Sequence, residues 1–534
     1  MKNHLIVIKG GTLIDGTGKS TIKNSIIIIL GSKILDVGTV GEVNVPDNTE
    51  VIEVKGKTII PSFIDSHTHF ILMGIRTLTT IDLSNTNSIA EIVDQVQKRV
   101  AELPNGAWII GHGWDESNWD EKRYPTRDDL DQISPNNPVV LTPYYGHLMV
   151  VNSRALELAN VTKETSDPPS GKIDRNPVNN EATGILREEA MDLIEKVKPP
   201  MTEEMALAGI EKACKIVLSN GCASIHELES DALNIRIYQT AYEKGLLKIR
   251  AYVMPEARFT ESMLDGLEVL GVRTQFGNDF LRIGSVKIYT DGSMGSRTAV
   301  FYDSYADDPS TRGIFAIPPE ELKKRVLRAH KLGMQVAIHA IGDKAIDQAI
   351  NAIETALLQE PKKNHRHRIE HCELVSEDQI QRIKQLGIVT SMQPNFVGEW
   401  GNFGGMYEQR LGSQRFKLHN PFRKLLDEGI PLAFGSDCGY CPPWPFNPIF
   451  GVWSAVNHPI RENRISLVEA IKCYTLNGAY ASFEENIKGS IEPGKLADIT
   501  ILSEDLSLIS PTRLLDVKVE MTMVNGKIQY KAKE

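Results

Sequence analysis

The sequence predicts an α/β protein: a (β/α)8 TIM-like barrel accompanied by a small β-sandwich domain built from both chain termini. Three observations lead to this prediction. Short β-rich runs occupy both ends of the 534-residue chain, eight apolar runs alternate with amphipathic stretches through its centre, and several of those runs end in a polar residue. Strand–helix alternation favours a parallel sheet, and a count of eight favours closure into a barrel. A doubly wound open sheet is the alternative.

The two chain ends share one pattern. Residues 1–57 contain β-branched runs separated by Gly, Asp and Asn, and residues 489–534 repeat this style with a hairpin signal at Asn525–Gly526. Neither end alone offers enough strands for a stable sheet. We therefore expect one β-sandwich made of both ends, flanking a barrel at 58–488.

The predicted barrel strands are apolar and rich in β-branched residues, and they cover 58–67, 222–228, 248–254, 283–292, 335–340, 367–372, 387–394 and 431–437. Helical patterns such as PEELKKRVLRAHKLG and SEDQIQRIKQLG lie between them. A long insertion at about 72–215 follows the first strand, and we expect it to cover the mouth of the barrel.

Composition excludes several classes of protein. Apolar content of 41% and charged content of 24% are ordinary for a globular enzyme. The net charge of −10 is spread along the chain and offers no basic footprint for nucleic acid. Lys9 interrupts the first apolar run, and the run at 25–30 is too short to span a bilayer. We expect a cytoplasmic protein with no membrane segment that acts on a small molecule, and a homodimer is the default expectation for its assembly.

The six cysteines are few and scattered, which fits a reducing compartment better than a disulfide framework. Cys438 and Cys441 form a C-x-x-C, the spacing of a redox pair or of half a zinc site. Because the sequence holds no second C-x-x-C, two unpaired thiols in a Gly/Pro-rich loop is the favoured interpretation.

Polar residues occur at the ends of the predicted strands. They are His67 and His69 on the first strand, Lys287 on the fourth, His339 on the fifth, His371 on the sixth and Asp437 on the eighth. The carboxyl ends of barrel strands meet at one mouth, and side chains two apart on a strand point to the same side. Four imidazoles and a carboxylate suit Zn2+, and also Fe2+, Mn2+ or Co2+.

Each of these residues alone has a simpler explanation. His339 fits a core imidazole, Asp437 a helix N-cap, and Lys287 a partly buried structural lysine. Their joint placement is harder to explain in that way, because burying unpaired imidazoles and carboxylates is costly and a shared cation compensates that cost.

A second group of polar and aromatic residues is a candidate substrate-binding set: His112, Trp114, His147, His226, Asp291 and Gln393. Such groups suit a partly apolar substrate, and Gln393 ends the seventh strand. The alternative is structural. The residues of the insertion would then pack it against itself, His226 would fill a layer of the barrel, and Asp291 would be a turn residue beside Gly292.

Several segments resemble a known family. PSFIDSHTH, VAIHAIGDKAID, HRIEHC, FGSD and GSIEPGKLADITIL resemble the amidohydrolase superfamily. GWDESNW, VNSRAL, VKIYTDGSMGSRTA and MQPNF resemble its family 3 branch, which includes N-substituted formamide deformylases. The resemblance spans nearly the whole chain. It implies a metal-bearing (β/α)8 barrel with a β-sandwich from both ends, and hydrolysis of an amide-like or other non-peptide C–N bond.

The resemblance also implies the ligands, namely His67 and His69 on a more buried metal, His339 and His371 on a second metal, Lys287 bridging as a carboxylated lysine, and Asp437 as ligand and proton shuttle. A free lysine cation would repel a metal, so Lys287 needs that modification or a lowered pKa. If Lys287 is instead an unmodified group facing the substrate, one metal rather than two is expected.

The implied reaction is attack by metal-bound hydroxide on a carbonyl or amidine carbon, with Asp437 moving the proton from water to the departing nitrogen. One alternative is a mononuclear metal deaminase of a cyclic amidine, although no His-x-x-Glu directly follows the predicted fourth or fifth strand. Another is a barrel scaffold without activity, which is disfavoured because no expected ligand position is lost. An oxidoreductase is disfavoured because no G-x-G-x-x-G follows an early strand.

Overall fold

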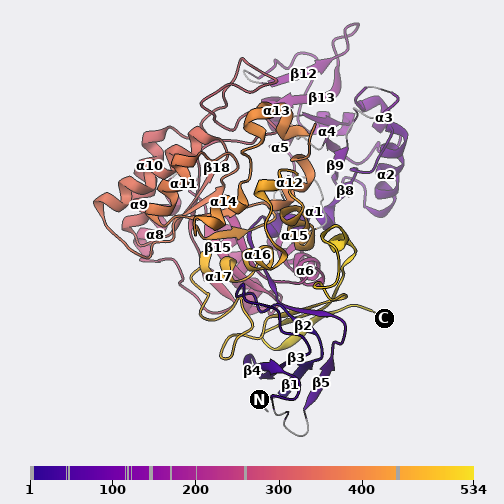
Figure 1. Cartoon of the computed structure of the whole chain (residues 1–534). Helices are drawn as coiled ribbons and strands as arrows, with labels where there is room; N and C mark the ends of the chain where they lie inside the picture. The colour runs from indigo at the N-terminus through magenta and orange to yellow at the C-terminus, as the bar shows by residue number, and fades with distance from the viewer. Residues whose placement is uncertain are drawn as a thin grey trace. The chain divides into compact units, whose positions relative to one another are not determined.

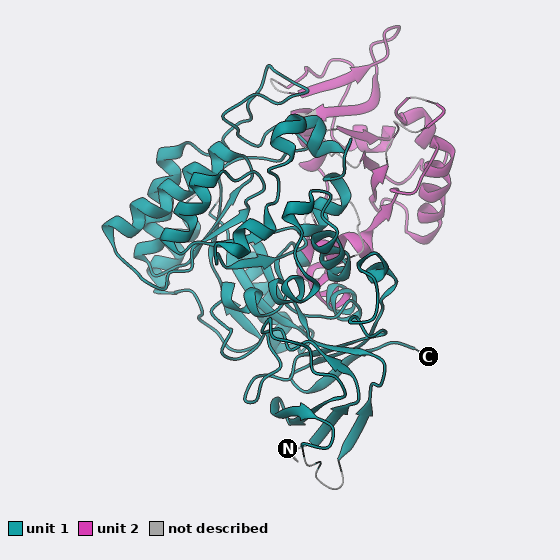
Figure 2. Cartoon of the chain, in the orientation of Figure 1, with its two compact units in different colours: residues 1–70, 213–438, 446–534 teal, residues 71–212, 439–445 magenta. Residues whose placement is uncertain are grey.

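The computed structural model describes residues 5–43, 45, 49–114, 116, 119–121, 123–143, 148–168, 171–199, 201–257, 261–439 and 446–533. The chain forms two compact units (Figure 2). Unit 1 comprises residues 1–70, 213–438 and 446–534, and unit 2 comprises residues 71–212 and 439–445. Within the described part of the chain, no helix combines the length and the apolarity needed to cross a bilayer.

Strands from both ends of the chain form two sheets of unit 1. The first sheet, in the order β4-β3-β1-β5, contains β1 (Leu5–Lys9), β3 (Ser25–Leu30), β4 (Lys33–Thr39) and β5 (Glu50–Glu53). The second, in the order β2-β6-β22-β23-β24, contains β2 (Thr12–Leu13), β6 (Thr58–Pro61), β22 (Ile499–Leu502), β23 (Val519–Val524) and β24 (Lys527–Lys531).

One apolar core joins these two sheets. Residues two apart on a strand share a face, and alternate isoleucines of three strands meet in this core: Ile6, Ile8, Ile27, Ile29, Ile499 and Ile501. The predicted hairpin is also present, because β23 and β24 pair antiparallel across Asn525 and Gly526. Both turn residues have positive φ, 55° and 72°, as a two-residue hairpin turn requires.

The centre of unit 1 holds two parallel sheets. One has the order β16-β15-β14-β7, with β7 (Phe63–Thr68), β14 (Cys222–Ser230), β15 (Arg250–Pro255) and β16 (Leu281–Ile283). The other has the order β17-β18-β19-β20-β21, with β17 (Val286–Tyr289), β18 (Val336–Ala340), β19 (Arg368–His371), β20 (Val389–Met392) and β21 (Leu432–Phe434). Each predicted barrel strand overlaps one of these strands.

Two predicted strands are interrupted. The strand expected at 58–67 divides at Ser62, whose N–H bonds to the Asp498 carbonyl, whereas the Phe63 N–H bonds to the Gly221 carbonyl. Its first part, β6, therefore belongs to the sheet of the chain ends and only β7 joins the parallel sheet. The strand expected at 283–292 divides in the same way at Gly284 into β16 and β17, because the Gly284 N–H bonds to the Val253 carbonyl whereas the Val286 N–H bonds to the Gln335 carbonyl.

The two parallel sheets are hydrogen-bonded to each other at both ends of the strand series. The Asp437 N–H bonds to the His67 carbonyl (2.7 Å), and the His69 N–H bonds to the Cys438 carbonyl (2.9 Å). At the other end, the Ala257 N–H bonds to the Lys287 carbonyl (2.9 Å). These contacts bring residues far apart in sequence to the carboxyl end of β7.

The helices of unit 1 alternate with the parallel strands or follow them: α7 (Ala232–Glu243), α8 (Ser262–Leu270), α9 (Pro319–Lys331), α10 (Asp343–Gln359), α11 (Glu377–Leu386), α12 (Pro394–Trp400), α13 (Met406–Phe416), α14 (Phe422–Asp427), α15 (Pro448–Val456), α16 (Leu467–Cys473) and α17 (Leu476–Ala481). Helices α9, α10 and α11 pack side by side (Figure 1). The two helical patterns quoted from the sequence are α9, which starts with Pro319, and α11, which starts with a Ser376–Gln379 capping box.

Unit 2 has a sheet and a core of its own. Its strand order is β12-β13-β11-β10-β9-β8, with β8 (Thr80–Asp82), β9 (Ile109–Trp114), β10 (Val139–Pro143), β11 (Leu148–Val151), β12 (Gly171–Arg175) and β13 (Ala182–Glu188). The helices that lie in this unit or cross its boundary are α1 (Phe70–Thr79), α2 (Ile89–Glu102), α3 (Arg127–Asp131), α4 (Ser153–Leu158), α5 (Asp192–Glu195) and α6 (Glu203–Ser219).

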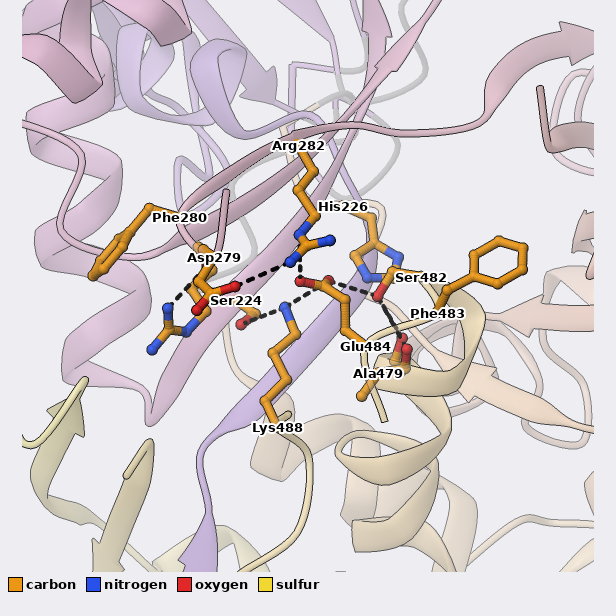
Figure 3. A network of polar contacts seen from close by, with 12 residues as sticks. Ser224, His226, Asp279, Phe280, Arg282, Ala479, Ser482, Phe483, Glu484 and Lys488 are labelled. Carbon is orange, nitrogen blue, oxygen red and sulfur yellow. Dashed lines mark hydrogen bonds and ion pairs between the residues drawn. The ribbon is translucent and has the colours of Figure 1, made fainter. Parts of the chain in front are cut away.

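A buried ionic network lies near the amino-terminal ends of the parallel strands (Figure 3). The Glu484 carboxylate contacts Lys488 Nζ at 2.9 Å and Arg282 Nε at 3.3 Å, and it accepts a hydrogen bond from Ser482 Oγ at 2.9 Å. Lys488 Nζ also donates to Ser224 Oγ on β14. The network thus links two parallel strands to the segment that follows α17.

Glu484→Gln should destabilise the protein by about 3–5 kcal/mol, because it leaves the buried Lys488 ammonium without its counter-charge. The double variant Glu484→Gln/Lys488→Met should lose less than this single variant, since it removes both charges. Chemical denaturation of the three proteins measures the differences. A double variant that is less stable than Glu484→Gln would contradict this account of the network.

Candidate metal centre

His67, His69 and Asp437 converge at the carboxyl end of β7. Their potential ligand atoms all lie within 4.8 Å of one another. Asp437 Oδ1 is 3.3 Å from His67 Nε2 and 3.1 Å from His69 Nε2. Among the described residues, this is the only group of three or more His, Cys, Asp or Glu side chains that meets so closely.

The Asp437 carboxyl group is held in its charged form. Burial disfavours the charge, but the neighbouring His67 and His69 side chains, by charge and hydrogen bonding, bring the pKa of Asp437 well below its usual value. Two imidazole nitrogens around one carboxylate oxygen form a donor set that fits a divalent cation such as Zn2+.

The orientation of His67 is set by two buried residues of β19. His67 Nδ1 lies 2.7 Å from Glu370 Oε2. Arg368 donates to both oxygens of Glu370, from Nε to Oε1 at 2.7 Å and from Nη2 to Oε2 at 2.9 Å. The charge of Arg368 and the His67 hydrogen bond outweigh burial and hold the pKa of Glu370 well below its usual value. The Glu370 carboxylate therefore accepts the Nδ1–H of His67, which turns Nε2 towards Asp437 and makes it the nitrogen that would bind a metal in place of its proton.

Arg368 is also the hub of the sheet interior. Its Nη1 lies 2.9 Å from His226 Nδ1, and its Nη2 donates to the Ser66 carbonyl (2.7 Å) and to Ser391 Oγ (3.1 Å). His226 is fully buried, and burial together with the charge of Arg368 brings its pKa well below the usual value. This placement favours the structural alternative for His226, which fills a layer beneath the metal centre.

His371 and His339 continue the row of imidazoles beyond His67. The ring centroids of His67 and His371 are 4.6 Å apart, and those of His371 and His339 are 4.4 Å apart. Burial and the charge of Lys287 lower the pKa of His339 to about 3, and burial also keeps the pKa of His371 low. His339 Nε2 donates to the Gly292 carbonyl at 2.9 Å, so Nδ1 is the ring nitrogen that keeps its lone pair. His371 Nδ1 has no hydrogen-bond partner within the described part of the chain.

Lys287 lies near this row of imidazoles, and its charge acts on both His339 and His371. It is fully buried on β17, and its Nζ is 4.6 Å from the ring centroid of Tyr289. The Tyr289 ring stacks on His339 at 5.0 Å. Lys287, His339 and His371 are thus close to the His67–His69–Asp437 cluster but do not belong to it.

Left-handed backbone conformations aim two of these side chains. His371 has φ 71°, Cys372 φ 51° and Asp437 φ 55°. Such values are uncommon for residues other than glycine and persist only where surrounding structure holds them. The Cys372 N–H bonds to the Ala340 carbonyl at 3.0 Å, and the Asp437 N–H bonds to His67. The sequence carries no signal for these conformations.

Two buried aspartates support the loops of the site. Asp65 accepts hydrogen bonds from Ser436 N and Oγ (2.9 and 2.5 Å) and from His67 N (3.0 Å), and burial raises its pKa to about 6. It ties β7 to the loop that carries Asp437. Asp65 precedes His67 by two positions, but nothing in the sequence pattern indicates this role.

Asp291 accepts three backbone hydrogen bonds, from Val300 (2.8 Å), Ile341 (3.1 Å) and Gly342 (3.0 Å). Burial raises its pKa to about 7, and its Oδ1 is 3.5 Å from His339 Nε2. These contacts favour a structural role, in which Asp291 joins the loop after β17 to the start of α10.

Three more residues near the site were missed by the sequence analysis: Arg368, Glu370 and Glu373. All are buried, and burial raises the pKa of Glu373 to about 8. For Arg368 and Glu370 the available signal was the occurrence of charged residues within a short buried strand, which normally excludes them. Glu373 follows that strand and carried no such signal. Gln393 follows β20 and is 1% exposed.

The two described candidate residues of unit 2, His112 and Trp114, contact other residues of that unit. His112 Nδ1 is 2.7 Å from Thr142 Oγ1. Trp114 is fully buried with its ring centroid 5.6 Å from that of Trp119, within the core of the unit. This favours the packing alternative for Trp114. His147 lies outside the described residues.

The C-x-x-C is described only in part. Cys438 is partly exposed, and its carbonyl accepts the His69 N–H and the Thr68 hydroxyl. Cys441 lies outside the described residues. Cys438 therefore contributes to the site through its backbone.

Comparison with known proteins identifies the family. The model of the amidohydrolase family 3 matches residues 50–530. The chain is 34% identical to the putative amidohydrolase YtcJ of Bacillus subtilis, over 90% of each chain. It is 28% identical to an N-substituted formamide deformylase of Arthrobacter pascens, over 94% of each chain. An uncharacterized metal-dependent hydrolase from Pyrococcus horikoshii OT3 superposes with a TM-score of 0.77 at 29% identity, covering 95% of this chain and 99% of that one. The chain belongs to the amidohydrolase family, as the resemblance predicted.

Glu370→Gln should weaken zinc binding about 10–100-fold, because the amide no longer fixes the Nδ1–H tautomer of His67. Competition with a chromophoric chelator measures the affinity. Glu320→Gln, the same change at an exposed side chain, is the control and should bind as the wild type does. Equal affinities of Glu370→Gln and the control would contradict the orienting role.

Proposed function

We propose that this protein is a metal-dependent hydrolase that cleaves a non-peptide, amide-like C–N bond. The observation that carries the proposal is the meeting of His67 Nε2, His69 Nε2 and Asp437 Oδ1 at the end of one strand. Family membership supports it, as do the relatives described as an amidohydrolase, a deformylase and a metal-dependent hydrolase. The fold proposed with it is a closed (β/α)8 barrel, supported by the hydrogen bonds that join the two parallel sheets at both ends.

The cation would be held by His67, His69 and Asp437, and Zn2+ is the ion best suited to these ligands. A divalent metal there would supply a Lewis acid for the substrate oxygen and would make water nucleophilic near neutral pH. A second metal would be held by His339 and His371, with Lys287 carboxylated to give an anionic bridge. The neutral state of both histidines and the unpartnered Nδ1 of His371 support this second site.

Asp437 is the proton carrier in this proposal. Its carboxylate is ionised before reaction, so it can accept a proton from the attacking water. The same group then protonates the departing nitrogen, which otherwise leaves as a poor anionic leaving group. Its position beside both His67 and His69 keeps the proton within reach of the reacting atoms.

A mononuclear metal deaminase of a cyclic amidine is the second candidate. It is favoured by the fact that only three side chains, not six, form the close cluster among the described residues. The same histidine pair and Asp437 would hold its single metal, and Lys287 would remain unmodified.

Metal content and activity test both candidates. Elemental analysis of protein purified without chelators should find about two metals per chain, falling in His67→Ala. Hydrolysis of a panel of N-substituted formamides and acyl amides should disappear after dialysis against a chelator and return with Zn2+. One metal together with ammonia release from cyclic amidines would favour the deaminase. Absence of metal and of activity on both panels would contradict both candidates.

A further inference from the structure

The junction between β20 and α12 holds two buried side-chain amides that the metal centre does not use. Gln393 and Asn395, on either side of Pro394, are 1% and 6% exposed. Within the described part of the chain, neither Oε1 nor Nε2 of Gln393 has a hydrogen-bond partner, and Oδ1 of Asn395 also lacks one. Such groups are rare, because buried polar atoms are nearly always paired.

The junction contacts the residues of the metal centre. Asn395 Nδ2 donates to the carbonyl of Ser436 at 2.9 Å, immediately before Asp437. The Phe396 ring stacks parallel to the His371 ring, with centroids 6.3 Å apart. Asn395 and Phe396 therefore lie beside residues of the candidate metal centre.

The direction of the Gln393 side chain follows from the strand before it. Ser391 Oγ, two positions earlier, contacts Ser66 Oγ at 3.0 Å and Arg368 Nη2 at 3.1 Å in the sheet interior. Gln393 stays extended, with φ −114° and ψ 89°, so its side chain lies on the same face as Ser391. It is one pleat closer to the carboxyl ends of the strands, where His67 and Asp437 meet.

We propose that Gln393, with Asn395 Oδ1 as a further acceptor, binds a neutral carboxamide or ureido group of the substrate next to the scissile C–N bond. This rests on the proposed hydrolase function. The unmet atoms of Gln393 are one donor group and one acceptor, which is the complement of an amide. A carboxylate has only acceptor oxygens and would face the acceptors Gln393 Oε1 and Asn395 Oδ1. A cation has only donors and would face the donor Gln393 Nε2. A neutral group with one donor and one acceptor therefore fits best.

A pair of isosteric substrates tests the proposal. N-formylglycinamide carries a terminal carboxamide, and N-isobutylformamide replaces its oxygen and nitrogen by methyl groups. The wild type should favour N-formylglycinamide by at least about tenfold in kcat/KM, because a site built for hydrogen bonding rejects the analogue that lacks the partner. Gln393→Leu should abolish this preference, because it should lower kcat/KM for N-formylglycinamide at least about tenfold more than kcat/KM for N-isobutylformamide.

Gln97→Leu, the same change at an exposed residue of α2, is the control and should keep the wild-type preference. Thermal melting of both variants checks that they fold. A wild type without preference, or an equal loss on both substrates in Gln393→Leu, would overturn the proposal.

Isothermal titration of both compounds separates this proposal from the hydrolase function. Selective binding of N-formylglycinamide by the wild type but not by Gln393→Leu, without turnover of either compound, would support the amide site and count against formamide hydrolysis. Turnover of both compounds without preference would support the hydrolase and overturn the amide site. If the wild type neither binds nor turns over either compound, the amide site is overturned as well.

Discussion

The buried ion pair between Arg368 and Glu370 is the constraint on which the rest of the site depends. It keeps the fully buried Glu370 carboxylate charged, and this carboxylate accepts the hydrogen bond from His67 Nδ1. An unpaired charge at this depth would instead be neutralised by a shifted pKa. The remaining donors of Arg368 reach three other strands, so the same guanidinium that orients the ligand also fixes the strands that carry it.

A second consequence is that contacts within the chain itself arrange the ligand atoms of the candidate metal centre. His67 presents Nε2, His339 keeps Nδ1 available, and Asp437 is ionised between two imidazoles. Asp65 and Asp291 hold the loops on either side, because each carboxylate accepts backbone N–H hydrogen bonds from them. Rigid placement of this kind is what catalysis by position and electrostatics requires.

Much of the fold follows from sequence patterns, because apolar runs and turn residues act locally. Every predicted barrel strand overlaps a parallel strand, and Asn525–Gly526 forms the expected hairpin. The convergence of His67, His69 and Asp437 was predictable because the carboxyl ends of parallel strands meet at one edge of the sheet. The strand breaks at Ser62 and Gly284 were not predicted. At each break the chain changes the strand to which it is hydrogen-bonded, and this change leaves no mark in the hydrophobic periodicity.

The supporting residues were beyond sequence reasoning for a different reason. Glu370 and His67 are 303 positions apart, and nothing local to either indicates the other. The left-handed backbone at His371 and Asp437 is likewise imposed by distant hydrogen bonds. Aromatic content in the insertion gave no means to distinguish a pocket wall from a core, and Trp114 belongs to the core.

Anomalous diffraction at the zinc edge, from crystals grown with Zn2+, tests the central claim most directly. The account predicts a peak bonded to Nε2 of both His67 and His69, with Nδ1 of His67 still on the Glu370 carboxylate. A peak bonded to Nδ1 of His67, or no peak among His67, His69 and Asp437, would contradict it.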